Sequence, residues 1–176
     1  MVNAEVVTLG VAIAIPDPWG IDLQEARAGY GDRLAWTIPT HVTLLPPTQV
    51  PKARLPLVDE HLASIAQGTE GFAVRLGGAD TFRPVTPTVF LRVEEGAKAC
   101  EAMADSIRSG PLRRRLQFPY HPHVTLAFDV ADEVLDQAFA DHATYSMTFN
   151  ATHITRYDLG EDGIWQPEAD FTLGEK

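Results

Sequence analysis

The chain has 176 residues, which is enough for one domain with a sizeable hydrophobic core. Hydrophobic residues make up 45% of the sequence and charged residues 22%, an ordinary mixture for a globular protein, and the formal net charge of −10 makes the surface repel polyphosphate backbones. These values argue against DNA or long RNA as a partner and leave room for a small anion bound in a local pocket.

The hydrophobic pattern predicts strands and helices in mixed order. In chain order these are a strand at residues 5–16, a helix at 21–30, a strand at 41–45, a helix at 51–67, strands at 72–76 and 88–93, a helix at 97–109, a short strand within 117–128, a helix at 133–139 and strands at 145–159 and 164–173. Pro46-Pro47 is expected to end the strand at 41–45, and residues 160–163 to form the last turn.

Short turns between several strand pairs favour antiparallel pairing over a doubly wound parallel sheet, so we predict an α+β fold. Residues 1–176 are expected to form a single two-lobed domain, because no long linker or low-complexity segment divides the sequence. No apolar stretch is long enough to span a membrane, and the single cysteine, Cys100, excludes a disulfide within the chain. We therefore expect a cytoplasmic monomer that does not bind membranes.

Two stretches about half a chain apart share one pattern. Residues 38–45 read Ile-Pro-Thr-His-Val-Thr-Leu-Leu, and residues 120–127 read Tyr-His-Pro-His-Val-Thr-Leu-Ala. In a strand, alternate side chains share a face, so His41 and Thr43 would lie opposite their apolar neighbours. His123 and Thr125 would do the same in the second copy. The spacing of 82 positions suits a pseudo-repeat with one copy in each lobe.

Two imidazoles and two hydroxyls that face each other across a cleft suit phosphodiester cleavage. The reaction needs a base for the attacking oxygen and an acid for the leaving oxygen, and histidine titrates near neutral pH. Threonine hydroxyls can donate hydrogen bonds to the non-bridging oxygens as charge builds up. One His-x-Thr triplet is weak evidence of chemistry, but two copies with the same apolar alternation are much more specific.

The paired His-h-Thr-h motifs, in which h is apolar, resemble those of the 2H phosphoesterase superfamily, which includes bacterial 2′-5′ RNA ligases and 2′,3′-cyclic nucleotide phosphodiesterases. Residues 11–16, 81–93 and 118–126 also look like segments of that family. The resemblance implies a bilobal fold with two antiparallel sheets, helices packed outside them, a central groove and pseudo-twofold symmetry. It also implies catalysis without a metal or another cofactor.

Carried over residue by residue, the resemblance implies that His41 and His123 form an acid–base pair and that Thr43 and Thr125 bind the phosphate. Which histidine is the base is left open, because it depends on the direction in which the substrate lies.

Four further residues are candidates for lining the groove, although a structural or surface role is at least as plausible for each. They are Tyr120, His121, Arg83 and Arg92. Tyr120 could stack on a base. His121 and His123 could begin a metal site, but no cysteine pair or suitably spaced carboxylate set completes one. We therefore expect no metal.

The sequence thus predicts a metal-independent phosphodiesterase that hydrolyses a 2′,3′-cyclic phosphate, or a related small phosphodiester, of a nucleotide or an RNA end. One alternative is a 2′-5′ RNA ligase or 2′-5′ phosphodiesterase, although the acidic stretch at residues 127–133 argues against ligation or binding of large RNA. The other alternative is a non-catalytic module that binds a nucleotide or an RNA end. Two intact titratable motifs argue against that second alternative.

Overall fold

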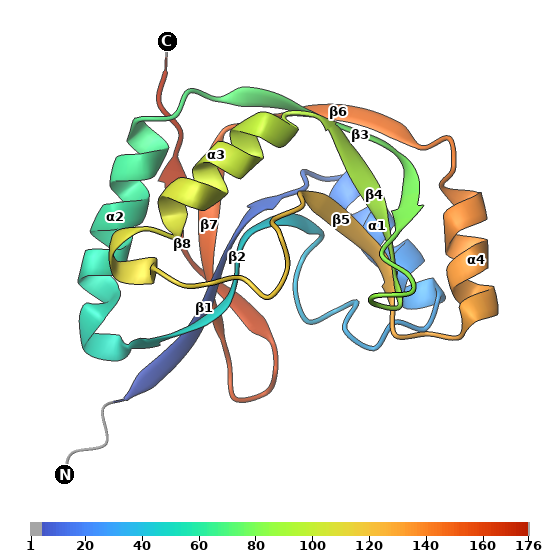
Figure 1. Ribbon diagram of the computed structural model, residues 1–176, viewed down its shortest axis with the longest axis horizontal. Coiled ribbons are helices and arrows are strands. Elements are labelled where there is room, and N and C mark those ends of the chain that lie inside the picture. The colour runs from blue at the N-terminus through green and yellow to red at the C-terminus, as the bar shows by residue number, and fades with distance from the viewer. Residues whose placement is uncertain (1–4, 176) are drawn as a thin grey trace.

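The computed structural model describes residues 5–175, and within them two four-stranded antiparallel sheets form the centre of the fold (Figure 1). The first sheet has the strand order β2-β1-β7-β8, with β1 at Val6–Ala14, β2 at His41–Pro51, β7 at His153–Leu159 and β8 at Trp165–Thr172. The second has the order β5-β4-β3-β6, with β3 at Phe72–Thr81, β4 at Thr88–Glu95, β5 at His123–Phe128 and β6 at Ser146–Ala151. The predicted α+β class with two antiparallel sheets is confirmed.

The helices lie outside the sheets, as expected. They are α1 at Trp19–Gly29, α2 at Leu55–Gln67, α3 at Ala97–Ile107 and α4 at Asp132–Asp141, with short 3₁₀ turns η1 at Lys52–Arg54 and η2 at Gly110–Leu112. Figure 1 shows α2 and α3 on one side of the molecule and α1 and α4 on the other. No helix among residues 5–175 is long and apolar enough to cross a membrane.

Two helices connect the sheets by packing across them. Helix α1 lies between two strands of the first sheet in sequence, yet it contacts β5 of the second sheet. Helix α3 lies between β4 and β5 in sequence, yet it contacts β2 of the first sheet. The edge strands β2 and β5 also contact each other. This reciprocal packing holds the two motif strands against each other.

Strand β2 is longer than the strand predicted at residues 41–45. The expected end at Pro46-Pro47 is wrong, because the strand continues to Pro51. Proline lacks a backbone N–H, but β2 is an edge strand, where that donor is not needed on the open side. Pro46 and Pro47 together lie opposite a single residue of β1, Gly10, which forms a β-bulge.

The single strand predicted at residues 145–159 is also wrong, because it divides at Thr152 into β6 and β7. Strand β6 pairs with β3 in the second sheet, whereas β7 pairs with β1 and β8 in the first. Strand β6 alternates buried and exposed side chains, whereas four consecutive residues of β7, 154–157, are buried and two of them, Thr155 and Arg156, are polar. The hydrophobic pattern therefore does not reveal where the chain passes from one sheet to the other.

The apolar faces of the motif strands are fully buried. Val42 and Leu44 in β2, and Val124 and Leu126 in β5, are each 0% exposed. Burial of one face of each strand fixes its register, because a shift by one residue would turn these side chains to solvent. The motif threonines and histidines must therefore lie on the opposite faces.

Truncation of this core should reduce stability. Leu126→Ala is expected to lower the free energy of unfolding by about 2–5 kcal/mol, because it leaves a cavity under β5. The matched control, Leu57→Ala in α2, changes a side chain that is 55% exposed and should alter stability by less than about 0.5 kcal/mol. Urea denaturation measures both changes, and equal stability losses in the two variants would contradict this account of the core.

Candidate active site

The structure brings the two sequence motifs together. His41 is the first residue of β2 and His123 the first residue of β5, and these are the edge strands at which the two sheets meet. His41, Thr43, His123 and Thr125 are all half-buried, in alternation with fully buried apolar residues. The arrangement expected from the alternation is therefore present in both strands.

The two imidazoles are held by the same kind of hydrogen bond. The Nδ1 atom of His41 lies 2.8 Å from the carbonyl oxygen of Pro39, and Nδ1 of His123 lies 2.7 Å from the carbonyl oxygen of His121. A carbonyl oxygen only accepts, so Nδ1 must carry the proton in both rings. In a neutral imidazole this leaves Nε2 unprotonated and able to accept a proton.

Burial lowers the pKa of both histidines. The pKa of His41 falls to about 4, mainly because burial disfavours the charged ring and further because of the positive charges of Arg27 and protonated His123. The pKa of His123 is lowered by burial and by His121. The backbone hydrogen bonds act in the opposite direction but do not offset burial. Both rings are therefore neutral at pH 7 when no ligand is present.

The two larger of the three cavities beside the histidines adjoin one motif each. One of about 120 Å³ adjoins the first motif, and its lining includes His41, Thr43, Tyr157 and Trp165. A larger one of about 410 Å³ adjoins the second motif and is mainly apolar. It is lined by Phe82, Val85, Thr86, Phe118, Pro119, Tyr120, His121 and His123.

Two of the four groove candidates, Tyr120 and His121, line the larger cavity beside His123. The Tyr120 hydroxyl also donates a hydrogen bond of 2.8 Å to the carbonyl oxygen of Thr43, so it connects the lead-in of the second motif to β2. The ring of His121 lies edge-on to Phe82 and Phe90. Both residues therefore have structural contacts as well as a place in the cavity wall.

The other two candidates, Arg83 and Arg92, contact carboxylates. Arg83 forms ion pairs with Asp132 at 3.4 Å and Asp136 at 2.8 Å, and Arg92 forms one with Glu94 at 3.4 Å. Neither arginine is among the residues that line the cavities beside the histidines. A role for them in the groove stays a prediction. Among residues 5–175, no three histidine, cysteine, aspartate or glutamate side chains converge on a point where they could hold a metal ion.

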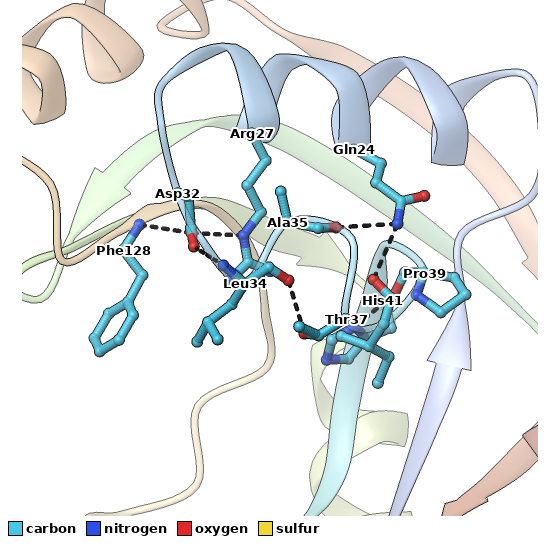
Figure 2. A network of polar contacts seen from close by, with 10 residues as sticks. Gln24, Arg27, Asp32, Leu34, Ala35, Thr37, Pro39, His41 and Phe128 are labelled. Carbon is cyan, nitrogen blue, oxygen red and sulfur yellow. Dashed lines mark hydrogen bonds and ion pairs between the residues drawn. The ribbon is translucent and has the colours of Figure 1, made fainter. Parts of the chain in front are cut away.

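A polar network behind the first motif was not predicted from the sequence (Figure 2). Gln24 in α1 donates hydrogen bonds to the carbonyl oxygens of Ala35 and Ile38, which lie in the loop that leads to His41. Arg27, one turn further along α1, forms an ion pair of 2.6 Å with Asp32. The sequence marks this network only weakly. Gln24 and Arg27 are two polar residues three positions apart on a predicted helix, and Asp32 is an aspartate that follows a glycine.

Comparison with known proteins places these features in a family. A family model described as the 2′-5′ RNA ligase superfamily matches residues 15–163. BH1439 from Halalkalibacterium halodurans, whose name assigns it provisionally to the phosphoesterases, is 31% identical over 100 residues, which cover 56% of this chain and 58% of that protein. Bcer98_0945 from Bacillus cytotoxicus, with the same provisional name, is 25% identical over 142 residues, 78% of this chain and 81% of that protein.

A solved structure supports the fold. LigT from E. coli, complexed with 3′-AMP, superposes with a TM-score of 0.71 at 20% sequence identity and covers 96% of this chain and 99% of its own. At this identity the likeness concerns the fold alone. The family model spans most of the chain, including both motifs. The chain therefore belongs to the 2′-5′ RNA ligase superfamily, the group of 2H phosphoesterases that its paired motifs resemble.

Proposed function

We propose that this phosphoesterase is a phosphodiesterase that hydrolyses a 2′,3′-cyclic nucleotide, or a related small phosphodiester, by acid–base catalysis with His41 and His123. The observation that carries the proposal is the equivalence of the two histidines. Each begins a motif strand, each has Nδ1 fixed by a carbonyl oxygen two residues earlier, and each is left with Nε2 as its reactive nitrogen. LigT has been crystallised with 3′-AMP and with phosphate, which supports a ligand of this size and charge.

In the proposed reaction, one neutral imidazole accepts a proton from water through Nε2 while the water oxygen attacks phosphorus. The other imidazole, in its protonated form, donates a proton to the ribose oxygen that leaves, so the products are a phosphate monoester and a free hydroxyl. The resting site holds two neutral rings because burial lowers both pKa values. The negative charge of a bound phosphodiester favours protonation of one ring and so prepares the acid.

Thr43 and Thr125 are proposed to hold the non-bridging oxygens. Each lies two residues after its histidine, on the same face of the strand. The hydroxyls can donate to the phosphate oxygens, and these bonds strengthen as negative charge builds up in the transition state.

The cavity beside His123 is proposed to take the nucleoside. Its volume of about 410 Å³ lies in the usual range of small-molecule sites, roughly 300–1,000 Å³. Phe82, Phe118 and Tyr120 provide aromatic surface for a planar base. The 120 Å³ cavity beside His41 is below that range.

The experiment that tests the proposed function is turnover of a panel of 2′,3′-cyclic nucleotides in the presence of EDTA. His41→Ala and His123→Ala are each expected to lower kcat by about 10²–10⁴-fold, the usual contribution of a general acid or base. Circular dichroism serves as the control for folding. Full activity in either folded variant, or loss of wild-type turnover on addition of EDTA, would refute the mechanism.

The threonines should contribute less than the pair of histidines. Thr43→Ala and Thr125→Ala are each expected to reduce kcat by about 10²–10³-fold, because one donor to the transition state is lost. Thr43→Ser and Thr125→Ser keep the hydroxyl and serve as matched controls that should stay close to wild type. If serine and alanine had the same effect at both positions, the threonines would act through packing rather than through hydrogen bonds.

The protonation state of His41 can be measured directly. Its pKa of about 4 in the folded protein lies below the ordinary 6.5, so the unfolded chain takes up the proton first as the pH falls. Its contribution to stability is therefore complete above about pH 6.5 and is lost as the pH falls towards 4. NMR should find the His41 ring neutral at pH 5.5, with the resonance assigned by its disappearance in His41→Asn. A ring that titrates near pH 6.5 would contradict the burial of His41.

The nucleoside cavity gives a separate prediction. Phe118→Ala removes a half-exposed aromatic side chain from its wall and should raise KM for a cyclic nucleotide about 5–100-fold, since stacking on one base contributes about 1–3 kcal/mol. With ribose 2′,3′-cyclic phosphate, which has no base, the variant and the wild type should have the same KM. An equal rise in KM for both substrates would mean that Phe118 shapes the site without contacting the base.

A further inference from the structure

Asp32 is a buried carboxylate that joins three parts of the chain. Its side chain is 1% exposed and accepts hydrogen bonds from the backbone N–H groups of Leu34 at 2.9 Å and Phe128 at 3.0 Å. It also accepts a 2.6 Å hydrogen bond from Nε of Arg27 (Figure 2). Phe128 is the last residue of β5, and Arg27 belongs to α1. This ion pair therefore fixes the guanidinium of Arg27 close to the end of β5.

The guanidinium has donors left over. Only Nε of Arg27 takes part in a hydrogen bond within residues 5–175, so the two terminal amino groups can donate to a ligand. Arg27 shares a small void with His41 and Thr125, one residue from each motif, and with part of the loop before β2. The void holds about 10 Å³, which is roughly the space that one water-sized oxygen needs.

Arg27 is the fixed cationic donor beside this void, and its ion pair with Asp32 leaves the pair itself without net charge. Three cavities surround the motif residues, and among the described residues that line them only Arg27 carries a permanent positive charge. Both histidines are neutral at pH 7, and the whole chain has a formal charge of −10. A phosphodiester anion would therefore find its fixed cationic donor at Arg27.

We propose that Arg27 binds a non-bridging oxygen of the substrate phosphate in the void between His41 and Thr125, and that Asp32 is a positioning residue that holds the guanidinium there. The proposal rests on the proposed function, because it takes the phosphate to lie between the two motifs. It adds a third phosphate-binding group, from a helix outside both motifs, to the two threonine hydroxyls.

The test uses equilibrium binding of inorganic phosphate, measured by calorimetry at pH 7.5 and constant ionic strength. Arg27→Gln is expected to weaken binding about 10- to 100-fold, the usual contribution of a hydrogen bond to a charged group. Arg75→Gln is the matched control, because it removes the same charge from an arginine on β3 that pairs with Glu94. Its phosphate affinity should remain within twofold of wild type.

A double variant separates phosphate binding from structural support. Arg27→Gln alone leaves Asp32 buried without its cation and should lower Tm, whereas adding Asp32→Asn removes that unpaired charge and should restore part of the lost Tm. Phosphate affinity should stay low in the double variant. If the double variant bound phosphate as tightly as wild type, Arg27 would have only a structural role and the proposal would be overturned.

Two further outcomes would also overturn it: a folded Arg27→Gln variant with wild-type affinity, and a wild-type protein that does not bind phosphate at millimolar concentration. These binding results are independent of turnover. A wild-type protein that binds phosphate through Arg27 but hydrolyses neither a cyclic nucleotide nor a related small phosphodiester would refute the proposed function and leave this inference standing.

Discussion

Burial of one face of each motif strand determines how the residues of the site are oriented. Valine and leucine side chains in β2 and β5 are removed completely from solvent, and the alternation of a strand then leaves histidine and threonine on the opposite face. A slip of one residue would expose the apolar side chains and bury the polar ones. The energy of core packing therefore also sets the orientation of the residues proposed to carry out catalysis.

Packing across the two sheets brings these faces together. Helix α1 contacts β5 and helix α3 contacts β2, so each sheet is supported by a helix that follows a strand of the other. Polar contacts reinforce this arrangement at both ends of the motif strands: Tyr120 reaches the backbone of Thr43, and Asp32 reaches the backbone of Phe128. The site thus lies between two strands whose relative position is fixed by hydrogen bonds as well as by apolar contacts.

The sequence was sufficient to predict the parts that repeat. Two copies of a short pattern predicted the motif strands and their shared faces, and the mixed order of strands and helices with short turns predicted the α+β class. The length of β2 could not be predicted, because the tolerance of Pro46-Pro47 depends on the position of the strand at a sheet edge. The division at Thr152 and the contact of Asp32 with Phe128 depend on partners far away in sequence, and neither produces a local pattern. For the same reason the sequence did not point to Arg27, which is proposed to bind the phosphate.

His41 and His123 are proposed to act as one catalytic unit. The most direct measurement is a double-mutant comparison of kcat for a 2′,3′-cyclic nucleotide, with His41→Ala, His123→Ala and the double variant assayed side by side. The effects of substituting residues that act as a unit are not additive, so the double variant is expected to lose about as much activity as either single variant. Losses that multiply in the double variant would show that the two histidines contribute independently, and would contradict the account.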